Sequence, residues 1–236
     1  MRPTLALFDI DGTLVDTGGA GRLGLEASFR SVFGLDDVSG SLARVRFDGK
    51  TDPAIIADIA REAGILAAEV EARYADLQEA YLTALRKELQ APNPRRRVMP
   101  GVRPLLDRLA ARADVFLGLV TGNVEEGARV KLDAFGLNRY FVDGGFSSDH
   151  PERSEIARIA HQRLSRRAGF RFPVDRVMVV GDTELDVVCA RANGFRAIAV
   201  ESGWVPRDRL VAAGPDTLLA DLTDADAVLA AMGLAE

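Results

Sequence analysis

The sequence of 236 residues predicts an α/β fold, in which a Rossmann-like parallel sheet is interrupted after its first strand by an all-helical domain. Three observations support this prediction. From Gly101 onward, short apolar runs alternate with segments of helical periodicity, which is typical of a parallel sheet. The apolar run 5–8 also has the character of a buried strand. Residues 17–90, in contrast, show only helical spacing, so this block is an insertion between the first strand and the rest of the sheet.

The elements of the insertion follow a glycine-rich joint after the first strand. Helical spacing predicts a helix over 22–33, which Gly34 ends, and residues 35–51 have the irregular pattern of a loop. Pro53 marks the first turn of a second helix that runs to residue 62. One long helix is predicted over about 67–89.

A linker is predicted over residues 91–97, because two prolines prevent a continuous helix and three arginines keep the segment in water. We therefore assign residues 1–16 and 95–236 to an α/β core domain and residues 17–94 to a helical cap domain. An insertion at the carboxyl end of the first strand would cover the ligand site as a lid.

The second half of the chain supplies the other strands and helices of the predicted sheet. Strands are predicted where apolar runs are bounded by turn residues, namely over 115–120, 140–142, 177–180, 197–200 and 217–219. Helices are predicted between them, over 101–112, from the turn at 121–123 to 135, and over 149–167, 183–192, 206–213 and 225–231.

Composition excludes several classes of protein. A formal net charge of -5 argues against nucleic-acid binding. No apolar run approaches the roughly 20 residues of a membrane span, and no signal-peptide pattern is present. The single cysteine, Cys189, fits a reducing compartment, so we expect a cytoplasmic protein. The two histidines, His150 in a turn and His161 on a helix surface, are not expected to be catalytic.

Polar residues follow three of the predicted strands. Asp9 and Asp11 follow the first, the segment Thr121-Gly122-Asn123 follows the second, and Asp182 follows the strand at 177–180. The carboxyl ends of parallel strands meet at one edge of a sheet, which is where such folds bind ligands. We therefore expect these residues to form one site.

Four carboxylates would crowd this site, from Asp9, Asp11, Asp182 and Asp186. At an effective dielectric constant of about 20, each like-charged pair 4 Å apart costs roughly 4 kcal/mol, so a cation is needed. Oxygen ligands suit Mg²⁺, which also accepts a phosphate oxygen of a substrate. Asp186 has an alternative role, because Thr183 and Asp186 match a helix capping box, and the two roles are compatible.

Two further features indicate an anion at the same place. The segment Thr121-Gly122-Asn123 precedes a helix whose free N–H groups can bind an anion, although an ordinary turn with Asn123 as the N-cap explains it too. Arg153 lies in a helix first turn, where a cation opposes the helix dipole unless an anion or a neighbouring glutamate compensates it. Lys131 is a competing cation, but its mid-helix position suggests a surface residue.

These segments resemble the four motifs of the haloacid dehalogenase superfamily, in order and spacing. The matching segments are 9–16, 120–123, Arg153 and 181–186, and the insertion lies where the cap of that superfamily lies. The third motif more commonly contains Lys, so Arg153 departs from the pattern. The insertion resembles the cap of phosphoglycolate-phosphatase-like members.

The resemblance implies a role for each residue of the motifs. Asp9 would be the nucleophile and Asp11 the general acid and base. Mg²⁺ would be held by Asp9, the main-chain carbonyl of Asp11 and Asp182, assisted by Asp186. The phosphoryl group would be held by residues of the second and third motifs, namely Thr121, Gly122, Asn123 and Arg153.

The sequence thus predicts a Mg²⁺-dependent phosphatase of small phosphomonoesters, since dehalogenases of the superfamily lack an acid at the position of Asp11. A phosphomutase and a non-catalytic phospho-acceptor or binding module are the alternatives. Arg22, Arg46 and Lys50, beside glycines of the insertion, are candidate contacts to an acidic group of the substrate. The expected partner is a small phosphorylated metabolite, and the protein is expected to be a monomer or a homodimer.

Overall fold

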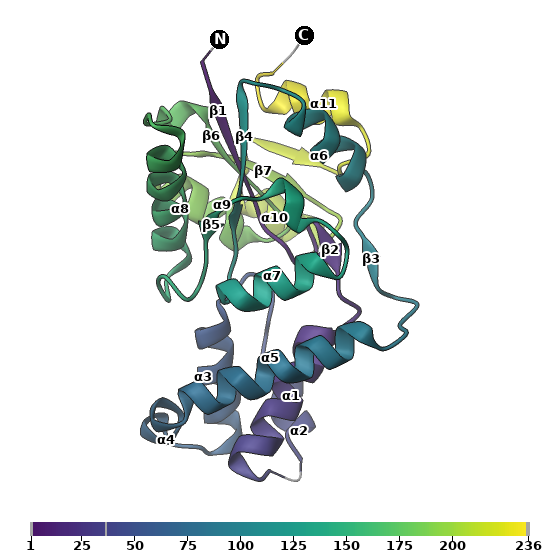
Figure 1. The fold of residues 1–236 in the computed structure, drawn as a ribbon, viewed down its shortest axis with the longest axis vertical. Helices are drawn as coiled ribbons and strands as arrows, with labels where there is room; N and C mark the ends of the chain where they lie inside the picture. Colours follow the sequence, from purple (N-terminus) through teal and green to yellow (C-terminus); the bar gives the residue numbers. More distant parts are fainter. Residues whose placement is uncertain (1, 36, 235–236) are drawn as a thin grey trace.

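The computed structural model describes residues 2–35 and 37–234 (Figure 1). Residues 1 and 235–236 of the predicted core domain and residue 36 of the predicted cap therefore lie outside the described residues. A six-stranded sheet has the order β5-β4-β1-β6-β7-β8, and every neighbouring pair in it is parallel, which confirms the predicted α/β class. In that order the strands span Gly144–Gly145, Val115–Val120, Thr4–Phe8, Val177–Gly181, Arg196–Val200 and Thr217–Leu219.

Helices cover both faces of the sheet, because side chains alternate between the faces along each strand. In β1, Ala6 and Phe8 belong to one apolar cluster and Leu5 and Leu7 to another. The first cluster includes α6 (Val102–Ala110), α7 (Glu125–Asp133) and α11 (Ala225–Ala231). The second includes α8 (Arg153–Ala168), α9 (Glu184–Ala192) and α10 (Arg207–Ala213).

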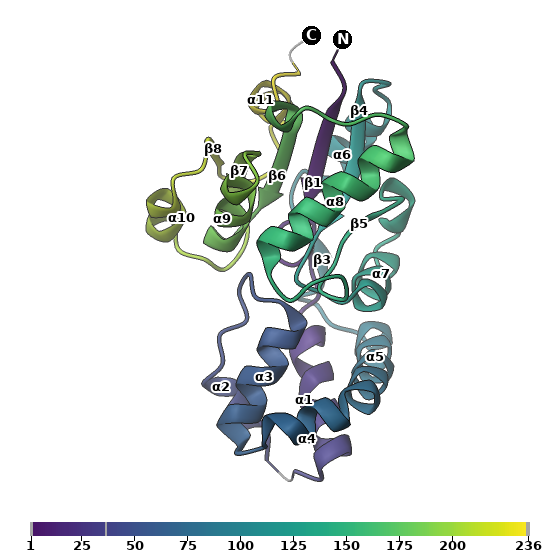
Figure 2. The same cartoon turned by 90° about the vertical axis from the view of Figure 1, so that its left-hand side faces the viewer.

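The helical insertion lies beyond the carboxyl ends of the strands (Figure 2), and its apolar side chains form a third cluster, which Val124 and Val130 also join. Its helices are α1 (Ala20–Phe33), α2 (Ser39–Ala43), α3 (Asp52–Ala63), α4 (Ala67–Ala72) and α5 (Tyr74–Gln90). The single long helix predicted over 67–89 is wrong, since the chain leaves helical geometry at Arg73. The described part of the chain has no helix long and apolar enough to cross a membrane.

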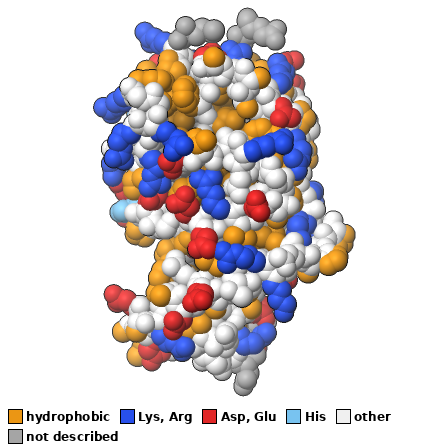
Figure 3. Space-filling model, in the orientation of Figure 1, with side chains coloured by type: hydrophobic (Ala, Val, Ile, Leu, Met, Phe, Trp, Pro, Cys, Tyr) orange, Lys and Arg blue, Asp and Glu red, His pale blue; other side chains and the backbone are white. Residues whose placement is uncertain are grey.

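A short antiparallel ladder joins the insertion to the sheet. The two strands, β2 (Val15–Asp16) and β3 (Arg97–Val98), lie where the chain leaves and re-enters the α/β part, and an ion pair of 3.4 Å links Arg97 to Asp16. The space-filling view is indented on its left-hand side between the α/β part and the insertion (Figure 3). Strands of two residues carry no readable periodicity, so the sequence does not predict this ladder.

The strand predicted at 140–142 is also wrong. The 3₁₀ helix η1 (Asn138–Tyr140) occupies its beginning, and Phe141 packs edge-on against Phe8 with ring centroids 6.0 Å apart. Phe141 therefore packs in the core, whereas Val142 is exposed, and the run does not form a strand. A second 3₁₀ helix, η2 (Val174–Arg176), precedes β6.

Two side chains that the sequence placed on helix surfaces are buried. His161 is 4% exposed, with Nε2 2.9 Å from the carbonyl oxygen of Phe172 and its ring against Phe195. His161 is therefore a core residue and not a surface residue. Lys131 is 5% exposed and belongs to the site described next.

Candidate active site at the carboxyl edge of the sheet

The polar residues at three strand ends lie together because β1 is flanked by β4 and β6. Asp9 directly follows β1, Thr121 follows β4 and Asp182 follows β6. The three strands are parallel, so these residues share the edge of the sheet that faces the helical insertion. Chain segments more than 100 residues apart thereby contribute to one site.

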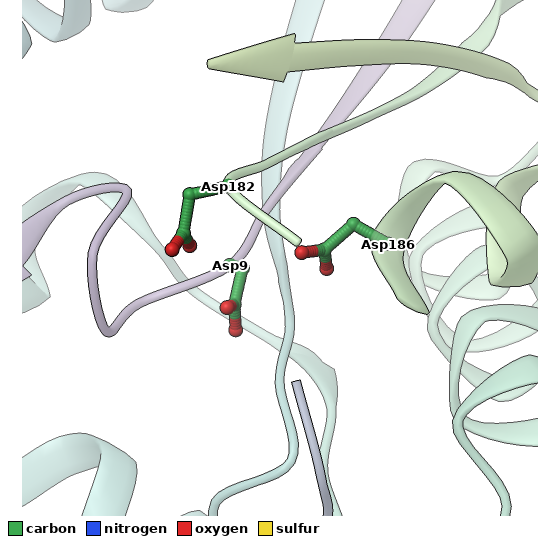
Figure 4. A group of neighbouring side chains, drawn as sticks. All are labelled: Asp9, Asp182 and Asp186. Atoms are coloured by element: carbon green, nitrogen blue, oxygen red, sulfur yellow. The ribbon is translucent and has the colours of Figure 1, made fainter. Parts of the chain in front are cut away.

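Asp9, Asp182 and Asp186 form a buried acidic cluster (Figure 4). One carboxylate oxygen from each lies within 4.8 Å of the others. Burial raises the pKa of Asp9 to about 6, although Arg153 opposes this increase. Burial and the Asp9 charge raise the pKa of Asp182 well above its usual value. The cluster is therefore unfavourable as three bare anions.

The donor set of this cluster suits a hard divalent cation. Three carboxylates beside the single guanidinium of Arg153 leave surplus negative charge, and carboxylate oxygens are the ligands that Mg²⁺ prefers. Two glycines leave room for the Asp182 carboxylate. A Cβ atom on Gly12 would lie 2.3 Å from Oδ2 of Asp182, and a Cβ atom on Gly203 would lie 1.8 Å from the same oxygen. Thr13 donates a hydrogen bond of 2.9 Å to the other oxygen. The residues present thus fit a Mg²⁺ site.

Arg153, the first residue of α8, lies against the acidic cluster. Its Nη2 is 3.0 Å from Oδ1 of Asp9 and 2.6 Å from Oδ1 of Asp186, and its Nη1 donates to the carbonyl of Gly49 in the insertion. Arg153 therefore pairs with two aspartates and not with a neighbouring glutamate. Its Nε is buried and has no hydrogen-bond acceptor among the described residues.

Asp186 does form the capping box that its spacing predicted. Thr183 is the N-cap of α9, its Oγ1 accepts from the N–H of Asp186 and its N–H donates to Oδ2 of Asp186 at 3.0 Å. The other oxygen, Oδ1, pairs with Arg153. Helix capping and membership of the acidic cluster therefore use the same carboxylate, and the two roles are compatible.

Asp11 lies apart from the acidic cluster and pairs with Lys131. The Nζ of Lys131 is 2.6 Å from Oδ2 of Asp11 and 2.6 Å from Oδ1 of Asn123. Asn123 in turn donates to the same Asp11 oxygen at 2.9 Å and to Oγ1 of Thr121 at 2.7 Å. Asn123 is not the helix N-cap, since α7 starts at Glu125 after Val124. Its side chain instead joins the Thr121 turn to Asp11.

A cavity of about 540 Å³ opens between the α/β part and the insertion, lined by Asp9, Asp11 and Thr121 on one side. All three predicted specificity residues line it, but two have carboxylate partners. Arg46 pairs with Glu184 at 2.6 Å and Lys50 with Asp58 at 2.5 Å. Arg22 instead lies over the ring of Phe47, 5.4 Å from its centroid. Other lining residues, among them Tyr81, Arg95 and Trp204, were not predicted as part of the site.

The insertion contacts the Thr121 turn directly through Asp52. The Asp52 N–H donates to the carbonyl of Gly122 at 2.7 Å, and its Oδ2 accepts from the N–H of Val124 at 2.8 Å. Burial raises the pKa of Asp52 to about 6, opposed by the charge of Lys131. A Cβ on Gly122 would lie 2.2 Å from the carbonyl oxygen of Lys50, so only glycine permits this contact. Sequence reasoning noted Asp52 only at a helix start.

Comparisons with known proteins agree with this architecture. Residues 3–194 match the family model described as haloacid dehalogenase-like hydrolase. The chain is 30% identical over 225 residues to a phosphoglycolate phosphatase of Agrobacterium fabrum, covering 92% of this chain and 88% of the relative. It is 31% identical over 222 residues to a phosphoglycolate phosphatase of Synechococcus elongatus, covering 92% and 93%.

A solved structure shares the fold over nearly the whole chain. CbbY from Rhodobacter sphaeroides, in complex with phosphate, matches with a TM-score of 0.73 and 22% identity, covering 94% of this chain and 96% of that one. The motif order, the sheet topology and the family match lead to one conclusion. This chain belongs to the haloacid dehalogenase-like hydrolases.

Proposed function

We propose that this chain is a Mg²⁺-dependent phosphatase that hydrolyses small phosphomonoesters through an aspartyl-phosphate on Asp9. The observation that carries the proposal is the position of Asp9, which belongs to the acidic cluster, contacts Arg153 and lines the cavity. The relatives named phosphoglycolate phosphatases support phosphomonoesters as the substrate class. A cavity of about 540 Å³ suits a small metabolite.

In the first step, a carboxylate oxygen of Asp9 attacks phosphorus and the bond from phosphorus to the leaving oxygen breaks. Asp11 donates a proton to that oxygen, so an alcohol departs and an aspartyl-phosphate remains. Only Ile10 separates Asp9 from Asp11 in the chain, and both aspartates line the cavity.

In the second step, water attacks the phosphorus of the aspartyl-phosphate. Asp11, now deprotonated, takes a proton from this water, and the bond between phosphorus and the Asp9 oxygen breaks. Inorganic phosphate leaves and Asp9 returns to its starting state. The same Asp11 carboxyl thus serves as acid and then as base, which explains why this chain needs an acid there.

The phosphoryl oxygens would be held by donors at the ends of β4 and α8. These are the Thr121 hydroxyl, the Gly122 amide, Asn123 and the guanidinium of Arg153, which lines the cavity. Asp9, the main-chain carbonyl of Asp11 and Asp182 would hold Mg²⁺, assisted by Asp186. When bound, the ion would offset charge on the phosphoryl group and the carboxylates.

The helical insertion acts in this proposal as a cap that selects the leaving group. Arg22 is the best placed of the three predicted specificity residues for an acidic group, since Arg46 and Lys50 are already paired. A cytoplasmic enzyme is consistent with the one buried cysteine.

The test is a panel of phosphomonoesters, including 2-phosphoglycolate and p-nitrophenyl phosphate, with Mg²⁺ or with EDTA. We expect phosphate release that requires Mg²⁺ and is absent from Asp9→Asn. Transfer of the phosphoryl group to a sugar phosphate, without net release, would indicate a phosphomutase. No turnover of any ester by the folded wild-type protein would contradict the proposal.

A further inference from the structure

We infer that Lys131 is a positioning residue for Asp11, holding one oxygen of that carboxyl group so that the other faces the leaving group. The inference rests on the proposed function, because it concerns the proton transfer assigned to Asp11. It assigns a role to a cation that the phosphoryl-binding set does not use.

The contacts around Asp11 are asymmetric. Oδ2 accepts from both Lys131 and Asn123, at 2.6 and 2.9 Å. Oδ1 has no hydrogen-bond partner within the described residues, and the side chain is 31% exposed beside the cavity. Two donors on one oxygen fix the orientation of the carboxyl plane. The free oxygen, Oδ1, is then the one that exchanges a proton with the leaving group and with water.

Lys131 is itself held by what surrounds it. Its side chain is 6% exposed, and its Nζ makes a second bond of 2.6 Å to Asn123. The insertion closes over it, since a Cβ on Gly21 of α1 would lie 3.4 Å from Nζ. Asp52 of α3 adds a second carboxylate whose charge interacts with Lys131. A buried ammonium group with fixed partners is a rigid anchor for Asp11.

The same contacts argue against Lys131 as a ligand of the phosphoryl group. Its Nζ bonds Asp11 and Asn123, whereas Arg153 contacts the nucleophile Asp9 and retains an unpartnered donor. The two cations therefore divide the work. Arg153 acts at the phosphoryl group, and Lys131 acts through Asp11.

The test compares leaving groups of different basicity. An alkyl phosphate needs a proton on its leaving oxygen, whereas 2,4-dinitrophenyl phosphate does not. For Lys131→Met we expect kcat/KM for the alkyl phosphate to fall at least about tenfold more than for the dinitrophenyl ester. Asp11→Asn should show the same selectivity, and adding Lys131→Met to it should cause little further loss. Lys87→Met, at an exposed position of α5, is the matched control.

Equal losses on both esters would overturn the inference, because a merely structural residue affects all substrates alike. A rise in KM on both esters with unchanged kcat would instead make Lys131 a phosphate ligand. Lys131→Gln serves if the Met variant does not fold. The alkyl phosphate is one that the wild-type protein hydrolyses in the panel; if the wild-type protein hydrolyses no ester of the panel, the proposed function itself fails, and that result is distinct from a loss of selectivity.

Discussion

Replacing Asp182 by Asn tests the buried acidic cluster without disturbing its packing. The side chain keeps its size and an acceptor for the Thr13 hydroxyl, which bonds Oδ1 at 2.9 Å. One of three carboxylates is lost from a site where Arg153 is the contacting cation. Without metal, the variant should therefore be more stable than the wild-type protein, and with Mg²⁺ it should lose that advantage.

The magnitude follows from the charges around Asp182, which is 1% exposed. A like-charged pair 4 Å apart costs roughly 4 kcal/mol at an effective dielectric constant of about 20. Arg153 offsets part of this cost and partial protonation relieves more, so we expect about 1–3 kcal/mol. For a chain of this size that is about 2–12 °C in Tm. A hundredfold excess of Mg²⁺ over its Kd should stabilise the wild-type protein by about 2.7 kcal/mol.

Thermal melting at pH 7.5, in EDTA and in MgCl₂, measures both effects. We expect a large Mg²⁺ shift for wild-type protein and little for Asp182→Asn. The control is Asp133→Asn, which removes an exposed acid at the end of α7 and should keep the full shift. An undiminished Mg²⁺ shift in Asp182→Asn, or a lower Tm in EDTA, would refute the reasoning.

Three further predictions concern single residues. Asp9→Asn should lower hydrolysis of p-nitrophenyl phosphate by at least about a thousandfold with an intact circular dichroism spectrum; normal turnover would remove it as the nucleophile. Arg153→Ala should raise KM and lower kcat by about 10–100-fold, and Arg153→Lys should recover part of the loss in steady-state assays. Asp52 has a folded-state pKa raised from 3.8 to about 6, so the fold binds its proton more tightly and loses stability as pH rises between these values. In urea unfolding, the free energy of unfolding of Asp52→Asn should therefore exceed that of the wild-type protein by about 1–3 kcal/mol at pH 8, but not near pH 4. Equal differences at both pH values would show that the effect does not come from ionisation of Asp52.

Much of the fold and the meeting of the strand ends could be predicted, because both depend on local patterns. Alternation of apolar runs and helices predicts a parallel sheet, and parallel strands bring Asp9, Thr121 and Asp182 to one edge. The capping box at Thr183 and Asp186 is equally local, since four consecutive residues define it.

The position of Lys131 could not be predicted from its mid-helix location alone. Its spacing from small and apolar residues could have indicated burial, because Lys131 lies on the same face of α7 as the buried residues Gly127, Ala128 and Leu132. Which charged side chain is buried depends on a partner distant in sequence, here Asp11. The pairing of Arg46 and Lys50 with carboxylates has the same non-local origin.

Helix α7 has a consequence for how the two parts of the chain depend on each other. Ala128 and Leu132 pack in the first apolar cluster, together with Ala6 and Phe8 of β1. Val124 and Val130 pack with the apolar residues of the insertion. Because α7 and the residue before it contribute side chains to both clusters, the two parts share a packed apolar boundary. Removing the insertion would expose Val124 and Val130 to water. An exchange of insertions between related enzymes would have to preserve apolar contacts to these two residues.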